Sequence, residues 1–113
     1  MGKLVIIKSN HAFSRVVRRG KSWRSKTVIL YCLRNRRNEG SRIGFTTSRQ
    51  YRSAVSRNRQ KRLLREAYHQ YAGQVKPGWD VVLTARHREP WPTFAENQRD
   101  VGRLLMKADL LHD

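Results

Sequence analysis

The sequence predicts an α+β fold, in which three helices pack on a small mixed β-sheet of three to four strands. Three observations support this class. Segments rich in Val, Ile and Tyr indicate strands, segments with apolar residues three and four positions apart indicate helices, and the two kinds alternate in the order α-β-β-β-α-β-α. Because 113 residues suffice for one modest core, we expect a single domain over residues 1–113.

The first predicted helix covers about residues 10–19. Ser9 or Asn10 can serve as its N-cap, because a short polar side chain accepts a hydrogen bond from the free N–H groups of the first turn. Its apolar face is formed by Phe13, Val16 and Val17. Gly20 stands where a residue in the left-handed conformation would end the helix, and we expect that conformation there.

Two strand segments and a shorter one follow this helix. Residues 26–33 alternate and are rich in β-branched side chains, and a short strand near residues 21–24 is expected to precede them. The polar residues 34–40 are typical of a turn or exposed loop, and residues 41–47 form the next strand. Because a short loop joins 26–33 to 41–47, these strands are predicted to form an antiparallel hairpin.

The second helix is expected to begin after the N-cap Ser53 and to end near Tyr71, ahead of Gly73. The turn at residues 76–78 then leads into a strand at residues 79–85, whose apolar sequence indicates a buried strand.

The last helix follows a loop at residues 86–92 and begins at a capping box, in which Thr93 and Glu96 exchange hydrogen bonds. Glu96 and Asp100 are expected on its solvated face. Its apolar stripe consists of Val101, Leu104, Leu105, Ala108 and Leu111.

The formal charge of +17 points to a polyanionic partner, and it is unevenly distributed. Residues 1–65 hold 19 Lys and Arg against one acid, whereas residues 66–113 hold 6 against 7. A membrane partner is disfavoured, because no apolar run approaches about 18 residues and the apolar residues 4–7 are too few for a signal peptide. The lone Cys32 excludes an internal disulfide and fits a buried strand residue in a reducing, cytoplasmic setting.

The most informative segment is the second helix. At about 100° per residue, its apolar residues share one half of the helix and its basic residues share the other. The apolar half contains Leu63, Leu64, Ala67, Tyr68 and Tyr71, and the basic half contains Asn58, Lys61, Arg62 and Arg65. Arg57, Lys61 and Arg65 follow at intervals of four, with no acid before Glu66. A solvated face would ordinarily mix the two signs, so this pattern favours phosphate binding.

Aromatic side chains supply a second element of RNA recognition. Phe13 and Tyr31 could face a common groove in which unpaired bases stack, although core packing would equally explain either residue. No catalytic residue and no metal site is predicted in this chain. Its histidines, His11, His69, His87 and His112, are scattered without ligand spacing.

Over about residues 8–111 the chain resembles the bacterial ribonuclease P protein subunit. The resemblance rests on the strand and basic turn at residues 42–49 and on Ala54-Val55, Arg57-Asn58-Arg59, Lys61-Arg62 and Arg65-Glu66. Phe13, spaced four and seven residues before Val17 and Gly20, and residues 78–82 add support. The family's fold implies that the second helix makes a left-handed crossover between parallel strands.

The resemblance implies an endoribonuclease that works as a ribonucleoprotein. In this family a large RNA removes the 5′ leader of precursor tRNA with bound Mg²⁺, held mainly by the RNA subunit and substrate. Contact with the RNA subunit is implied for Arg57, Asn58, Arg59, Lys61, Arg62 and Arg65, and in an electrostatic role for Arg49; leader contact is implied for Phe13 and Tyr31. The partners implied are the RNA subunit and precursor tRNA, with neither a membrane nor an obligate protein partner.

Three positions depart from the family pattern. The turn at residues 50–53 lacks a usual glycine, Val17 stands where an aromatic residue is common, and His69 replaces a frequent arginine. Two alternatives stay open at this point. One is a basic structural RNA-binding protein of the ribosomal type without a processing role, and the other is a stand-alone endonuclease.

Overall fold

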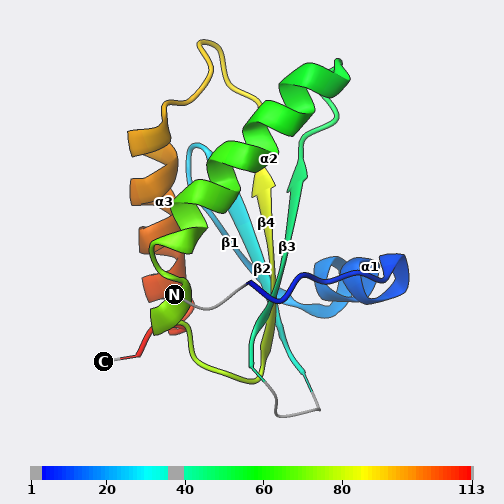
Figure 1. The fold of residues 1–113 in the computed structure, drawn as a ribbon, viewed down its shortest axis with the longest axis vertical. Helices are drawn as coiled ribbons and strands as arrows, with labels where there is room; N and C mark the ends of the chain where they lie inside the picture. The colour runs from blue at the N-terminus through cyan, green and yellow to red at the C-terminus, as the bar shows by residue number, and fades with distance from the viewer. Residues whose placement is uncertain (1–3, 36–39, 113) are drawn as a thin grey trace.

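The computed structural model describes residues 4–35 and 40–112, and its elements follow the predicted order (Figure 1). They are α1 (Asn10–Arg19), β1 (Lys21–Arg24), β2 (Val28–Arg34), β3 (Arg42–Thr47), α2 (Ala54–His69), the 3-10 turn η1 (Ala72–Gln74), β4 (Trp79–Ala85) and α3 (Phe94–Lys107). Residues 36–39 of the loop predicted at residues 34–40 lie outside the described residues, and β2 extends to Arg34. No helix in the described ranges is long and apolar enough to cross a membrane.

The four strands form one mixed sheet in the order β1-β2-β4-β3. The predicted hairpin between β2 and β3 is wrong, because β4 lies between them, antiparallel to β2 and parallel to β3. The central place of β4 agrees with its apolar sequence, since Val81, Val82 and Leu83 are all buried. In Figure 1, β3 and β4 both point upward, α2 crosses in front of the sheet, and β4 lies to the left of β3. The crossover is therefore left-handed, which is the rare hand for such a unit.

The two faces of the sheet carry two different layers (Figure 1). Leu30 and Cys32 of β2 point into the main core beneath α2 and α3, as does Ile43 of β3. The alternate residues Tyr31 and Leu33 pack on the opposite face, where α1 lies. This alternation is the period of two expected for strands, and it leaves α1 as the sole helix of its face in the described residues.

The predicted N-caps are confirmed in all three helices. The Ser9 side chain accepts a hydrogen bond from the Ala12 N–H, Ser53 accepts one from Ser56, and Thr93 forms a complete capping box with Glu96. These caps satisfy N–H groups that would otherwise have no partner at the start of each helix.

Helix α1 ends at Arg19 as predicted, but other expectations for the carboxyl ends of the helices are wrong. Gly20 is extended (φ −73°) rather than left-handed, and its small size is needed because a Cβ there would lie 2.5 Å from the Val16 carbonyl oxygen. Helix α2 ends at His69, two residues before Tyr71. Helix α3 ends at Lys107, because the chain takes a positive φ at Asp109, and Leu111 instead forms a bridge with Val75.

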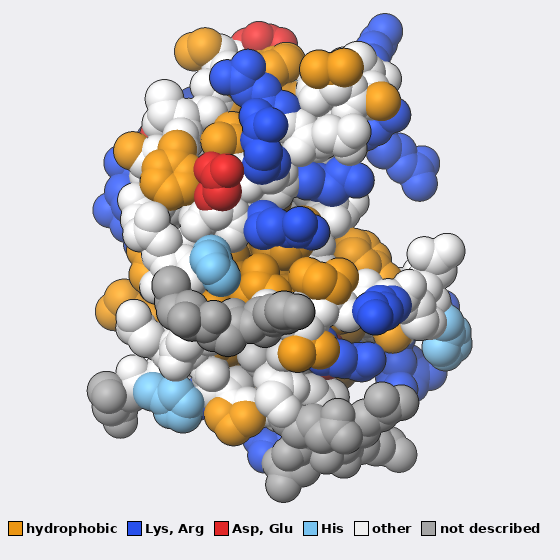
Figure 2. Space-filling model, viewed as in Figure 1, with side chains coloured by type: hydrophobic (Ala, Val, Ile, Leu, Met, Phe, Trp, Pro, Cys, Tyr) orange, Lys and Arg blue, Asp and Glu red, His pale blue; other side chains and the backbone are white. Residues whose placement is uncertain are grey.

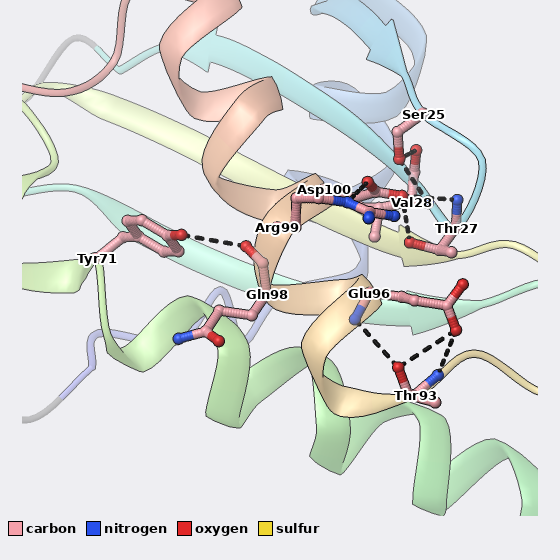
Figure 3. A network of polar contacts seen from close by, with 9 residues as sticks. All are labelled: Ser25, Thr27, Val28, Tyr71, Thr93, Glu96, Gln98, Arg99 and Asp100. Carbon is pink, nitrogen blue, oxygen red and sulfur yellow. Dashed lines mark hydrogen bonds and ion pairs between the residues drawn. The ribbon is translucent and has the colours of Figure 1, made fainter.

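The expectation that Asp100 lies on a solvated helix face is wrong, because this residue is only 3% exposed. Its carboxylate accepts hydrogen bonds from the Thr27 backbone N–H (3.2 Å) and hydroxyl (2.7 Å), as Figure 3 shows. Burial raises the pKa of Asp100, but the hydrogen bonds from Thr27 and Ser25 and the charge of Arg99 outweigh it, so the pKa lies below its usual value. Residues 25–27 form a turn, in which the Val28 N–H donates to the Ser25 hydroxyl. Strand β2 therefore begins at Val28 and not at the predicted residue 26.

Replacing Asp100 with Ala is expected to lower the free energy of unfolding by about 2–3 kcal/mol, because the variant removes hydrogen bonds to a buried charged group. Chemical denaturation measures this change. The matched control is Arg103→Ala on the exposed face of the same helix, for which we expect a change within about 0.5 kcal/mol. Equal effects of the two variants would contradict the role assigned to Asp100.

The stabilisation by Asp100 should depend on pH with a defined sign. Because the folded-state pKa is lowered, the stabilisation is complete above the unfolded-state pKa of about 3.9 and is lost as the pH falls through the folded-state value. The difference in unfolding free energy between the wild type and Asp100→Ala should therefore shrink below about pH 4. A difference that stays constant into strong acid would show that the carboxylate charge is not responsible.

Candidate RNA interface

Helix α2 presents its basic residues to solvent and its apolar residues to the core. Asn58, Arg59, Lys61, Arg62 and Arg65 are exposed, whereas Leu64, Ala67 and Tyr68 are buried. The predicted division of the helix into two faces is confirmed. In Figure 2, the Lys and Arg side chains follow α2 across the visible face, above a strip of hydrophobic surface.

The positive charge of this face is not neutralised within the described part of the chain. The ion pairs found there join Arg42 to Asp80, Lys76 to Asp109 and Arg99 to Asp100, and Glu89 lies 3.4 Å from the His87 imidazole. None of these pairs involves a basic residue of α2. The exposed side chains of Arg59, Lys61, Arg62 and Arg65 are therefore available to an external polyanion.

The three consecutive residues of the Arg-Asn-Arg motif have different surroundings. Arg57 is half-buried, and its Nη1 donates hydrogen bonds to the carbonyl oxygens of Tyr51 (3.1 Å) and Arg52 (2.8 Å). Asn58 lines a groove, and the Arg59 guanidinium lies 5.7 Å from the ring centre of Trp91. Arg57 thus holds the turn before α2, the same turn that lacks the glycine usual in the family pattern. Sequence reasoning missed this role, because the acceptors are backbone carbonyls.

A groove of about 510 Å³ runs beside α2, and we call it the basic groove. It is lined by Ile6, Ile7, Phe13, Gly44, Phe45, Asn58, Lys61, Arg62 and Arg65. The Arg65 guanidinium lies 5.7 Å from the ring centre of Phe45, which fixes this long side chain over the groove. The floor is therefore apolar and aromatic, while one wall is cationic.

A second groove of about 640 Å³ lies between α1 and the sheet, and we call it the helix–sheet groove. It is lined by Asn10, His11, Phe13, Ser14, Val17, Arg18, Tyr31, Thr46 and Thr84. Phe13 and Tyr31, which the sequence singled out together, meet here, and Phe13 lines both grooves. Arg49 is exposed in the turn after β3 and is not among the residues that line either groove.

Comparison with known proteins agrees with this geometry. A family model described as Ribonuclease P matches residues 1–109. The ribonuclease P protein component of Natranaerobius thermophilus is 38% identical over 111 residues, covering 98% of this chain and 96% of the relative. That of Clostridium novyi is 36% identical and covers 92% and 93%. The chain belongs to the ribonuclease P protein family.

Solved structures of ribonuclease P proteins share the fold. The protein from Staphylococcus aureus superposes with a TM-score of 0.80 at 26% identity, covering 97% of this chain and all of that one. The protein from Thermotoga maritima gives a TM-score of 0.76 over 89% of this chain and 94% of that one, at 24% identity, and supports the fold alone. The α+β class and element order predicted from the sequence are confirmed.

The site on this chain offers positive charge and aromatic surface. In residues 4–35 and 40–112, no three His, Cys, Asp or Glu side chains are grouped as metal ligands. Burial raises the pKa of the Cys32 thiol in the core, and the nearby charge of Lys21 only partly offsets this. A buried, protonated thiol is a poor nucleophile.

Gly44 lines the basic groove directly beneath Phe13, the residue that both grooves share, and sequence reasoning assigned it no role. A Cβ at this position would lie 2.7 Å from Cε2 of Phe13, so only glycine lets the Phe13 ring rest on β3. The sequence did contain a signal, because a glycine in the interior of a strand often marks a place where another group packs closely against the backbone.

Replacing Gly44 with Ala should displace the Phe13 ring from its place between the grooves. We expect the free energy of unfolding to fall by about 1–3 kcal/mol, as is typical of overpacking. Denaturation measures this decrease, and nuclear Overhauser effects between the Phe13 ring and the backbone of residue 44 should weaken. Gly73→Ala is the control, because a Cβ there meets nothing within 4 Å. An unmoved Phe13 ring in Gly44→Ala would contradict the close approach described here.

Proposed function

We propose that this chain is the protein subunit of ribonuclease P. It binds the catalytic RNA subunit and the 5′ leader of precursor tRNA, and it assists endonucleolytic removal of that leader to form the mature 5′ end. The observation that carries this proposal is the basic face of α2, which has no acidic partner in the described residues and borders an aromatic groove.

Docking to the RNA subunit is assigned to the exposed face of α2. Asn58, Lys61, Arg62 and Arg65 line the basic groove, and Arg59 extends the same face on its other side. Arginine guanidinium groups match phosphate oxygens with two parallel hydrogen bonds, which suits them to a structured RNA backbone. Arg57 contributes by holding the turn at Tyr51 and Arg52, and Arg49 adds charge from the exposed turn after β3.

Leader binding is assigned to the helix–sheet groove. Phe13 and Tyr31 offer ring surface for unpaired bases, and Arg18 and His11 lie at the same groove. Stacking tolerates any base, since every base has an aromatic face, so this groove would accept leaders of different sequence. Only precursor tRNA carries a leader, and such contacts would therefore favour the precursor over the mature product.

The role of the protein is then largely electrostatic. The RNA subunit and precursor tRNA are both polyanions, and a chain of charge +17 between them neutralises phosphates and releases counterions. We assign catalysis to the RNA subunit and place the required Mg²⁺ mainly on that RNA and the substrate.

Reconstitution tests the proposed function. With a bacterial ribonuclease P RNA at limiting Mg²⁺, adding the protein should raise the rate of 5′-leader cleavage, and the protein without RNA should not cleave. In the same assay, Lys61→Ala combined with Arg62→Ala should weaken assembly. The slope of log affinity against log salt should fall by about 0.7–0.9 for each phosphate that the variant no longer neutralises.

The control pair is Arg103→Ala with Lys107→Ala, because both residues are exposed on α3, away from the grooves. Circular dichroism should show that both double variants are folded. Cleavage by the protein alone, or RNA binding without any stimulation of cleavage, would reject the proposed function; the latter would favour a structural RNA-binding protein.

Replacing Tyr31 with Ala should weaken binding of leader-bearing precursor tRNA to the holoenzyme by the contribution of one stacked base, about 1–3 kcal/mol. Binding of mature tRNA and assembly with the RNA subunit should change little. Tyr31→Phe is the matched control, since it keeps the ring in the helix–sheet groove. Equally weakened binding of precursor and mature tRNA would indicate that Tyr31 acts through packing.

A further inference from the structure

Trp91 is an exposed aromatic residue that neither the motif nor the two grooves explain. It lies in the segment between β4 and α3 and is 41% exposed, the one aromatic side chain among the large exposed hydrophobic residues of the described chain. An exposed tryptophan ring offers a flat surface on which an unpaired base can stack.

The Trp91 ring is held in place by neighbours on two sides. The Arg59 guanidinium lies 5.7 Å from its ring centre, and the Tyr51 ring meets it edge-on at 5.9 Å and 78°. Tyr51 is itself fixed, because it is only 2% exposed and its hydroxyl donates to the Arg86 carbonyl oxygen at 3.0 Å. His87 packs 4.9 Å from the Tyr51 ring. Contacts on two sides therefore hold the Trp91 ring in one orientation, and we call Trp91 with Arg59 the Trp91 platform.

This platform lies outside the basic groove, about 100° further around α2. Asn58 lines that groove, and the next residue, Arg59, contacts Trp91. Val55 lies one turn before Arg59 on the same helix face and is 79% exposed. The two acidic residues nearest to Trp91 in the sequence contact residues other than Arg59. Glu89 lies 3.4 Å from His87, and Glu96 is held in the Thr93 cap.

We propose that Trp91 and Arg59 form a stacking site for an unpaired nucleobase of the RNA subunit, with Arg59 bound to an adjacent phosphate. This inference rests on the proposed function and extends the interface of α2 to the segment between β4 and α3. An aromatic ring beside a guanidinium is the pairing that single-stranded nucleotides use, because the base stacks while the phosphate meets the charge. The site binds unpaired RNA in preference to an apolar protein surface, because the flanking residue of α2 is cationic.

The test measures binding of ribonuclease P RNA by the full chain over a range of salt concentrations. Trp91→Ala should weaken binding by about 5- to 150-fold, the range for one stacked base, without changing the slope of log affinity against log salt. Arg59→Ala should instead lower that slope by about 0.7–0.9. Trp91→Phe keeps an aromatic face and should retain most of the affinity. If the surface acted through charge alone, Trp91→Phe and Trp91→Ala would bind the RNA equally well.

Tryptophan fluorescence gives a second measurement of stacking, in which Trp91 itself is not replaced. With Trp23→Phe and Trp79→Phe, Trp91 is the remaining tryptophan, and its emission should be quenched when the RNA binds. Wild-type affinity in a folded Trp91→Ala, or unchanged Trp91 emission at RNA saturation, would overturn the stacking site alone. If the wild-type chain does not bind ribonuclease P RNA, the proposed function fails and this site fails with it.

Discussion

The repulsion between neighbouring cations on α2 is the constraint on which the interface depends. Arg57, Lys61 and Arg65 follow each other at intervals of one turn, and like charges at this spacing destabilise an isolated helix. The helix is held by its other face, where Leu64 and Tyr68 are buried against the sheet and α3. Packing, rather than ion pairing, keeps the charge in place, and an RNA partner can neutralise it without displacing an internal carboxylate.

The position of β4 explains why the two grooves meet. Because β3 and β4 are parallel neighbours, the chain must cross the sheet between them, and α2 is that crossover. The crossover brings the basic face of α2 beside β3, whose Gly44 leaves room for Phe13 from the helix on the other layer. A cationic wall and an aromatic floor, which come from distant parts of the chain, thus form one continuous surface.

Local signals in the sequence predicted the helices, strands and caps. The features that sequence reasoning missed depend on contacts between residues far apart in the chain. Short polar side chains before apolar periodicity located the caps at Ser53 and Thr93, and the angular pattern separated the faces of α2. The hairpin prediction is wrong because nothing between β2 and β3 reveals that β4 pairs between them. Asp100 resembled a solvated residue because Thr27, which binds its carboxylate, is 73 residues away. The shared groove of Phe13 and Tyr31 likewise depends on which face of the sheet α1 covers, and periodicity along the chain does not reveal this.

The amino-terminal half of α2 is held differently from the rest of the helix. Its buried positions are Ser56 and Gln60, and the Gln60 side-chain amide has no hydrogen-bond partner in the described chain, so burial there stabilises little. This half also carries the Arg-Asn-Arg motif. This half is stabilised instead by contacts of its Arg side chains. Arg57 donates hydrogen bonds to the preceding turn, and Arg59 packs on Trp91, which contacts Tyr51. Such lateral contacts can position the motif without apolar packing beneath it, and they place the β4–α3 segment beside the surface proposed to bind RNA.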